Sequence, residues 1–270
     1  MISARVVLWG SFGHTNLGDD LLLMSFMRIL QDEGLDNSEV AIRVRNTGEQ
    51  KWIKHLFPEV IIIQDDDCVA CDKLIFAGGT QFFSFPNGRK GLVRYASIAY
   101  NAIKLLGRIN FRANKYRNVT FQRAGAFSVG LGPFKSSGIV LLLVRQWIKR
   151  LSVIVVRDSK SLDYTSLYGA KGTSFIDKDI VYYRSLWDTS SHDTKIVKHN
   201  NQKPLVGLIL RDWTRGNVSF DYLDSIINFT KVHRDKYAFQ YFIFSEHDTL
   251  VMSRLNAENI DYYLWDVSNY

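Results

Sequence analysis

The residues best suited to chemistry stand in one short segment near the start of the chain, GSFGHTNLGDD. Its glycines permit positive φ angles and a close approach of the backbone to a ligand, and its side chains include Asn16, Asp19 and Asp20. The spacing differs from the dinucleotide fingerprint G-x-G-x-x-G, and two carboxylates at a helix start would repel a pyrophosphate. The segment therefore predicts a carboxylate that binds or deprotonates a sugar hydroxyl, beside the structural alternative that Asp19 or Asp20 is an N-cap.

Two later turns carry further candidate ligand-binding residues. The apolar run KLIFA leads directly into Gly78, Gly79 and Thr80, where the glycines serve either a ligand or only a tight turn. The run VIVV ends in Arg157 and Asp158, which could contact a ligand or form a structural ion pair at the end of a strand.

The C-terminal part of the chain adds an arginine and a histidine. Arg211 ends the apolar run LVGLIL, and its guanidinium offers a planar fork suited to a carboxylate or a phosphate. His247, in the loop SEHD, and His14 are the histidines best placed to titrate in a cleft. Asp177 and Asp179 could bind a divalent cation, but no third ligand accompanies them in the sequence, so we predict no metal site.

These residues need elements that bring them to one edge of a sheet. Short β-branched runs alternate with helical patterns, which is typical of an α/β fold with a parallel sheet. Such sheets bind ligands at the carboxyl ends of their strands, where all of the turns above are expected. The strands predicted in the first part of the chain are 5–9, 39–44, 60–63, 73–76, 127–130, 153–156 and 174–176, and the helices are 20–31, about 90–106, 139–151 and 159–167.

The chain is expected to contain two domains. Residues 186–203 are polar and aperiodic, which predicts a linker between a domain over 1–185 and a second α/β unit over 204–270. About 70 residues is small for an independent domain, so we expect the second domain to be incomplete. Its predicted strands are 205–210, 241–244 and 262–265, and its predicted helices are about 220–232 and one that starts at 250.

The net charge of +7 on 270 residues is unevenly distributed. No Asp or Glu occurs between Asp72 and Asp158, an interval rich in Lys and Arg. Such a block predicts an anionic partner, either a phosphorylated ligand or an anionic membrane face, with a solvated basic surface as the alternative. The sequence carries no recognisable nucleic-acid-binding motif, so we expect no nucleic-acid partner.

Composition also indicates the compartment. Two cysteines favour a reducing, intracellular setting over a disulfide framework. The longest apolar run, 138–144, is far shorter than the roughly 20 residues of a membrane span, and the first ten residues are too short for a signal peptide. We therefore expect a cytoplasmic protein, with the inner face of the plasma membrane as an alternative location.

Taken in order, the turns of this sequence resemble those of the polysaccharide pyruvyl transferase family. The matching segments are GSFGHTNLGDDLLL, FAGGTQFF, FSVGLGPF, VIVVRDSKSLDY, FIDKDIVY and VGLILRDW. The resemblance covers nearly the whole chain. It implies two Rossmann-like domains in a glycosyltransferase-B-like arrangement, with the active site in the cleft between them. It also implies transfer of a pyruvyl group from phosphoenolpyruvate to a sugar of a bacterial exopolysaccharide, capsule or cell-wall polymer, as a cyclic ketal.

The resemblance implies different roles on the two sides of that cleft. The loop with Asn16, Asp19 and Asp20 faces the sugar acceptor, and Arg211 matches an arginine of the phosphoenolpyruvate site. The donor needs a cationic clamp, a general acid for its methylene carbon, and a base for the attacking hydroxyl. We expect Asp19, Asp20 and His247 to be catalytic. The expected substrate-binding residues are His14, Asn16, Gly18, Gly78, Gly79, Thr80, Arg157 and Arg211.

The resemblance implies no cofactor beyond phosphoenolpyruvate as donor substrate. The implied partners are phosphoenolpyruvate and a sugar or lipid-linked oligosaccharide acceptor. The family's later Arg-Leu-His-type motif has no match in this sequence and is expected beyond Tyr270, which puts the activity of this chain alone in question. Two alternatives therefore stay open: a nucleotide-sugar glycosyltransferase of the same architecture, and an inactive, truncated member that binds a glycan.

Overall fold

A computed structural model describes most of the chain, in two compact units. The described residues are 1–13, 16–78, 82–84, 109–110, 115–116, 118–134, 139–183, 203–212 and 221–265. The first unit comprises Met1–Gly13 and Leu21–Asp188, and the second comprises His14–Asp20 and Thr189–Tyr270. The end of the segment GSFGHTNLGDD, with Asn16, Asp19 and Asp20, thus groups with the C-terminal part of the chain. The linker expected at 186–203 lies almost entirely outside the described residues.

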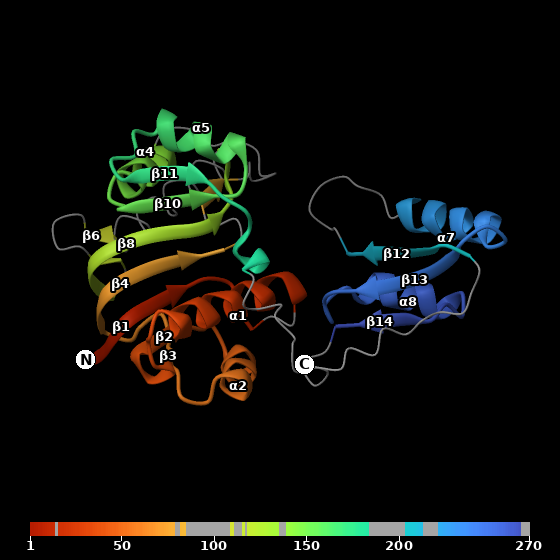
Figure 1. Cartoon of the computed structure of the whole chain (residues 1–270), viewed down its shortest axis with the longest axis horizontal. Helices are drawn as coiled ribbons and strands as arrows, with labels where there is room; N and C mark the ends of the chain where they lie inside the picture. Colours follow the sequence, from red (N-terminus) through yellow and green to blue (C-terminus); the bar gives the residue numbers. More distant parts are fainter. Residues whose placement is uncertain are drawn as a thin grey trace, which may run out of the picture. The chain divides into compact units, whose positions relative to one another are not determined.

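A parallel sheet forms the centre of the first unit (Figure 1). Its order, β11-β10-β8-β4-β1-β2-β3, is that of a doubly wound Rossmann-like sheet, because the chain moves outward from β1 in one direction and then from β4 in the other. All neighbouring pairs along this path are parallel. The seven strands are β1 (Ile2–Trp9), β2 (Val40–Arg43), β3 (Ile61–Ile63), β4 (Val69–Ala77), β8 (Val119–Val129), β10 (Val153–Val156) and β11 (Thr173–Ile176).

Helices lie on both faces of this sheet. Since β1, β2 and β3 follow one another in one direction and β8, β10 and β11 in the other, right-handed crossovers place their connecting helices on opposite faces. The helices are α1 (Leu17–Asp32), α2 (Thr47–Leu56), α4 (Ile139–Ile148) and α5 (Ser159–Leu167), with the short 3-10 turns η1 (Asn37–Glu39) and η2 (Ile180–Tyr182). None of the helices in the described part of the chain is long and apolar enough to cross a membrane.

Short strands complete the first unit. The strands β6 (Ile109–Asn110) and β7 (Lys115–Tyr116) form an antiparallel extension of β8. A separate two-stranded parallel sheet joins β5 (Phe82–Ser84) to β9 (Leu131–Phe134).

The main core of the first unit lies between the sheet and α4. Trp147 is 2% exposed, and its ring meets Phe76 of β4 and Phe121 of β8 edge-on, at centroid distances of 5.4 and 5.8 Å. Burying each such side chain stabilises the fold by about 1.5–3 kcal/mol. Trp147 therefore packs against both β4 and β8. The turn at the carboxyl end of β4 follows directly after this packed region.

The second unit is a smaller α/β layer. Its parallel sheet has the order β12 (Leu205–Leu210), β13 (Ala238–Ile243) and β14 (Tyr262–Leu264), connected by α7 (Asp221–His233) and α8 (Thr249–Ala257). Both crossovers run in the same direction, so both helices cover one face, where Leu210, Ile227 and Val251 form the core. On the other face Ile209 is 59% exposed.

The predicted α/β class with a parallel sheet is confirmed, and most predicted elements are present. The helix predicted at about 90–106 lies outside the described residues. The sequence pattern misses α2, whose buried apolar side chains are only Trp52 and Ile53. It also predicts 127–130 for a strand that extends over Val119–Val129, because polar residues interrupt the apolar run of β8.

Candidate functional site

Glycines follow two strands at the switch point of the first unit's sheet, between β1 and β4. Gly13 has a φ of +77°, and a Cβ there would lie 2.9 Å from the Cα atom of Glu49. Gly78 has a φ of +62°, and a Cβ there would lie 2.5 Å from a methyl group of Leu22. Local sterics account for a glycine at both positions, and for Gly78 this agrees with the tight-turn alternative. A ligand contact by Gly78 stays a prediction, and Gly79, Thr80 and His14 lie outside the described residues.

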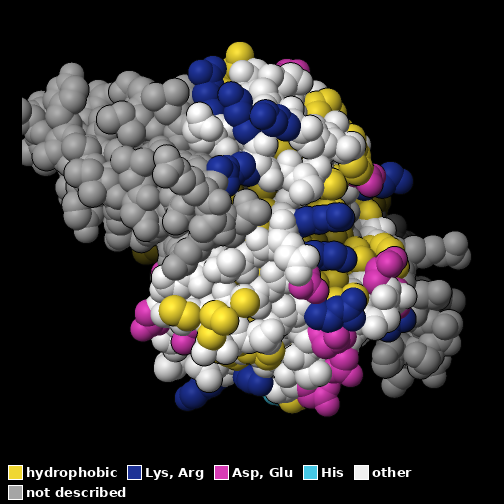
Figure 2. All heavy atoms as spheres, turned by 90° about the vertical axis from the view of Figure 1, so that its left-hand side faces the viewer, with side chains coloured by type: hydrophobic (Ala, Val, Ile, Leu, Met, Phe, Trp, Pro, Cys, Tyr) yellow, Lys and Arg dark blue, Asp and Glu magenta, His cyan; other side chains and the backbone are white. Residues whose placement is uncertain are grey.

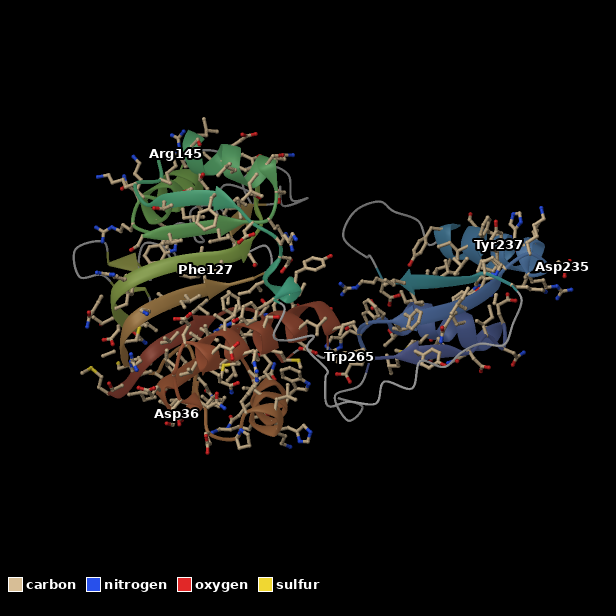
Figure 3. The ribbon with its side chains drawn as sticks, in the orientation of Figure 1. Asp36, Phe127, Arg145, Asp235, Tyr237 and Trp265 are labelled. Atoms are coloured by element: carbon tan, nitrogen blue, oxygen red, sulfur yellow. The ribbon has the colours of Figure 1, made fainter. Side chains whose placement is uncertain are left out.

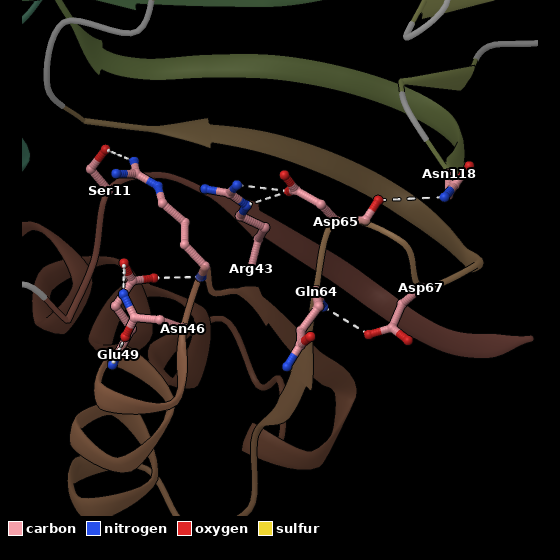
Figure 4. A network of polar contacts seen from close by, with 9 residues as sticks. Ser11, Arg43, Asn46, Glu49, Gln64, Asp65, Asp67 and Asn118 are labelled. Carbon is pink, nitrogen blue, oxygen red and sulfur yellow. Dashed lines mark hydrogen bonds and ion pairs between the residues drawn. The ribbon is translucent and has the colours of Figure 1, made fainter.

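The same edge holds a polar network that sequence reasoning missed (Figure 4). Glu49 is 3% exposed and accepts hydrogen bonds from the Arg45 backbone N at 2.6 Å and from Asn46 Nδ2 at 3.1 Å. Arg45 Nη2 in turn donates to Ser11 Oγ, 2.5 Å away, in the turn after β1. An arginine two residues after β2, the second strand of a βαβ unit, is the sequence signal that could have drawn attention to this network.

Arg43 closes the network on its other side. Its Nη2 atom lies 2.7 Å from an oxygen of Asp65, and its guanidinium carbon lies 5.3 Å from the centre of the Trp9 ring. The Asp65 carbonyl accepts a 3.4 Å hydrogen bond from Asn118 Nδ2. These contacts link β1 to the loops after β3 and before β8. They therefore have a structural role in the sheet, and none of them indicates a ligand.

The turn with Arg157 and Asp158 is organised differently from the predicted ion pair. Asp158 is the N-cap of α5 and accepts hydrogen bonds from Ser161 N at 2.7 Å and Ser161 Oγ at 2.9 Å. Arg157 instead lies 3.8 Å from Asp179, beyond β11. The pairing of Arg157 with Asp158 is therefore wrong, because the carboxylate satisfies the free N–H groups of the helix start. A substrate contact by Arg157 stays a prediction.

An apolar cavity of about 760 Å³ lies elsewhere in the first unit. It is bounded by α1, β4, β8, β10 and β11, with Phe26, Phe127 and Phe175 among its lining. Lys73 and Arg123, which are partners in the β4–β8 register, also line it and lie near the middle of these strands. None of the described residues that the sequence predicts for the site lines this cavity.

Charged side chains of both signs are visible on one face of the molecule. On the face shown in Figure 2, Lys and Arg side chains occur at the top, in a row on the right-hand side and at the bottom, and most acidic side chains lie in the lower half. The block between Asp72 and Asp158 includes β8 and α4, whereas acids such as Asp65, Asp66 and Asp67 precede it.

The first turn of α1 belongs to the second unit and packs against the carboxyl ends of strands in that unit. Asn16 forms an antiparallel bridge with Ser245, and Leu17 N donates to the Phe244 carbonyl at 2.9 Å. Because α1 begins at Leu17, neither Asp19 nor Asp20 is its N-cap, and that alternative is wrong. The predicted loop therefore lies where β13 ends.

The two adjacent carboxylates of this turn have different surroundings. Asp20 is fully buried, and Trp265, labelled in Figure 3, donates from its Nε1 atom to Asp20 Oδ2 at 3.0 Å. Asp19 is partly exposed and accepts a hydrogen bond from Asn16 Nδ2 at 2.8 Å. Asp20 thus makes a structural contact with the segment after β14, whereas Asp19 stays accessible. The catalytic role of either one stays a prediction.

Arg211 lies at the end of β12 beside a buried carboxylate. Its Nε atom is 3.6 Å from Asp248 Oδ2; the Arg211 side chain is 47% exposed and the Asp248 side chain 4%. Asp248 Oδ1 accepts a hydrogen bond from Asp212 N at 2.8 Å. Burial raises the pKa of Asp248 above its ordinary value, while the Asp212 hydrogen bond and the Arg211 guanidinium act in the opposite direction. Tyr222 Oη also donates to the Arg211 carbonyl.

His247 stands in the same loop as Asp248. Its side chain is exposed, and its backbone N donates to Ser245 Oγ at 3.3 Å. The structure therefore brings Asn16, Asp19, Arg211 and His247 to the carboxyl-end edge of one small sheet, where a guanidinium, an imidazole and a carboxylate are available. Among the described residues, no group of three His, Cys, Asp or Glu side chains is placed to hold a metal ion.

Comparison with known proteins identifies one family. A sequence model described as "Polysaccharide pyruvyl transferase" matches residues 16–269. Among solved structures, the chain is similar to a functionally uncharacterised protein from Klebsiella pneumoniae subsp. pneumoniae NTUH-K2044, with 13% sequence identity and a TM-score of 0.41. That similarity covers 97% of this chain and 82% of the other. No curated protein matches the chain.

Proposed function

The chain belongs to the polysaccharide pyruvyl transferase family, and from this premise we propose that it transfers a pyruvyl group from phosphoenolpyruvate to a sugar of a surface polysaccharide. The family match over residues 16–269 is the observation that carries the proposal. The product is a cyclic ketal on a bacterial exopolysaccharide, capsule or cell-wall polymer. The two units correspond to two Rossmann-like domains in a glycosyltransferase-B-like arrangement.

Arg211 is the donor-binding residue of this proposal. Phosphoenolpyruvate carries a phosphate and a carboxylate, and guanidinium groups bind both in a bidentate manner. Arg211 ends the first strand of the second unit and keeps about half of its side chain exposed, which supports contact with a small anion.

The reaction needs proton transfers that the same edge could supply. One sugar hydroxyl adds to C2 of phosphoenolpyruvate and a proton is added to C3, so the carbon–carbon double bond becomes single. A second hydroxyl then attacks C2, and the C2–oxygen bond to phosphate breaks to release inorganic phosphate. His247 acts as general acid toward C3, and Asp19 accepts the proton of an attacking hydroxyl. Asp20, which is buried against Trp265, supports the turn that carries Asp19.

The basic block of the first unit supports a lipid-linked acceptor and a location at the membrane. A lipid-linked oligosaccharide is presented at an anionic membrane face, and the basic block between Asp72 and Asp158 favours peripheral association with that face from the cytoplasm. Recovery of the protein with membranes that falls as salt concentration rises is the expected behaviour.

The deciding experiment measures phosphate release from phosphoenolpyruvate by the purified chain in the presence of candidate acceptors. We expect acceptor-dependent release and the gain of one pyruvyl group by the acceptor, measured by mass spectrometry. Arg211→Ala should abolish release, whereas Arg254→Ala should not, because Arg254 pairs with Asp224 and Glu258 on the helices. Binding of a nucleotide sugar without any phosphate release would instead support the glycosyltransferase alternative.

A further inference from the structure

We propose that Asp248 is a positioning residue that holds the guanidinium of Arg211 in the orientation that binds phosphoenolpyruvate. This inference rests on the proposed function, because it assigns Arg211 to the donor. It adds a residue that the sequence motifs do not single out. Asp248 touches no substrate in this scheme and acts only through Arg211.

The first argument is that the Asp248 carboxylate is buried and only one of its two oxygens accepts a hydrogen bond from a described residue. Asp248 is 3% exposed, and its Oδ1 atom is satisfied by the backbone N of Asp212 at 2.8 Å. Its Oδ2 atom is buried without a hydrogen bond to any described residue. A buried carboxylate oxygen is costly unless a charge faces it, and among the described residues Arg211 provides one, with its Nε atom at 3.6 Å. The arginine is therefore the partner that Asp248 requires.

The second argument is that Asp248 is not used as a helix cap. It occupies the N-cap position of α8, where an aspartate normally accepts a hydrogen bond from the first turn, but its side chain makes no such bond. Asp212 caps the helix instead, accepting from Leu250 N at 2.8 Å and Val251 N at 2.9 Å. The Asp248 carboxylate is thereby directed away from the helix and toward the end of β12.

The third argument is the geometry that this leaves for Arg211. The contact with Asp248 uses the Nε side of the guanidinium, and the side chain as a whole remains 47% exposed. A guanidinium held at Nε can still present its two Nη groups to a phosphate or carboxylate as a fork. Fixing the plane of that fork before binding reduces the rotamer freedom lost when the ligand arrives.

The test is a double-mutant cycle on phosphoenolpyruvate binding, measured by isothermal titration calorimetry with the whole chain. Asp248→Asn keeps the shape of the side chain and the acceptor for Asp212 N but removes the charge opposite Arg211. We expect it to weaken phosphoenolpyruvate binding about tenfold, within the range of coupling between contacting residues. Arg211→Ala should weaken binding at least as much, and the double variant should bind no more weakly than Arg211→Ala alone.

The matched control is Asp224→Asn, which removes an exposed carboxylate partner of Arg254 in the same unit and should leave binding unchanged. In turnover, Asp248→Asn should raise the KM for phosphoenolpyruvate and leave the KM for the acceptor unchanged, which a general loss of structure would not do. Normal binding by Asp248→Asn beside weak binding by Arg211→Ala would overturn the inference and leave the proposed function intact. Effects that multiply in the double variant would overturn it equally.

Two further results separate the inference from the function on which it rests. Unchanged phosphoenolpyruvate binding by Arg211→Ala would refute the donor role of Arg211 and, with it, the role of Asp248. If Asp248→Asn does not fold, Arg211→Lys gives the same test, because lysine keeps the charge but has no Nε fork for Asp248 to orient. Binding by Arg211→Lys that equals the wild type would then overturn the positioning role.

Discussion

The contact between Trp265 and Asp20 offers a sharp test of how the second unit is held together. Asp20 lies in the first turn of α1 and is fully buried, and Trp265 follows β14 at the far end of the described chain. Their 3.0 Å hydrogen bond therefore joins residues that are 245 positions apart. Replacing Trp265 by Phe removes the donor and keeps most of the ring.

The expected cost follows from the charge of the acceptor. A hydrogen bond to a charged group contributes about 1.5–3 kcal/mol, and losing its donor leaves a buried carboxylate less well satisfied. We therefore expect Trp265→Phe to lower the free energy of unfolding by about 2 kcal/mol beyond the effect of the smaller ring. For a protein of this size that corresponds to a fall in Tm of roughly 4–8 °C.

The control is a tryptophan that has no such bond. Trp52 in α2 is 8% exposed, and its buried Nε1 atom donates to no described residue. Trp52→Phe removes the same atoms from a buried site, so it measures the cost of the smaller ring alone. Urea unfolding followed by far-UV circular dichroism gives the free energies, and hydrogen exchange in residues 17–32 locates the change. Equal losses for the two variants would refute the reasoning.

Two further predictions concern a carboxylate and a pair of glycines. Burial raises the folded-state pKa of Asp248 above its ordinary value of 3.8. The free energy of unfolding should therefore fall as pH rises from 3.8 through the raised pKa, because the folded state loses a proton that it binds more tightly than the unfolded state. Urea unfolding at several pH values should show this loss in the wild type and not in Asp248→Asn. Gly13→Ala should cost roughly 2–4 kcal/mol, since it combines a positive φ with a contact of 2.9 Å to Glu49 Cα. Gly34→Ala, at a φ of +79° with nothing within 4 Å, should cost only about 1–2 kcal/mol; similar Tm values for the two variants would contradict the steric argument.

Much of the fold could be predicted because its signals are local. The β-branched runs VVLW and VIVV sit in parallel strands of the first unit, and the expected helix at 159–167 is present as α5. Where the signals weaken, the prediction fails. Helix α2 buries little apolar surface, and β8 carries exposed Gln122 and Arg123 within its apolar run. Helical or strand periodicity is hard to detect in such segments.

The candidate site could be predicted only residue by residue. Asn16 and Arg211 each follow from a local turn, but no local pattern predicts that Asn16 pairs with Ser245. That contact depends on the packing of segments more than 200 residues apart, which composition and spacing do not encode. The role of Asp248 is hidden for the same reason, since a sequence suggests a helix cap there and only the structure shows that Asp212 has taken it.

The adjacent carboxylates of the first loop can be separated by helix geometry. Successive residues of an α-helix point about 100° apart, so two neighbouring aspartates can have different surroundings. Asp20 faces inward and is held by Trp265, while Asp19 remains partly exposed and is oriented by Asn16. Under the proposed function, Asp20 supports the turn and Asp19 is the member assigned to accept a proton from the substrate. A similar contrast occurs around Arg211, whose half-exposed side chain lies 3.6 Å from the buried carboxylate of Asp248. Under the two proposals, a buried carboxylate in each place supports a polar side chain that is at least partly exposed.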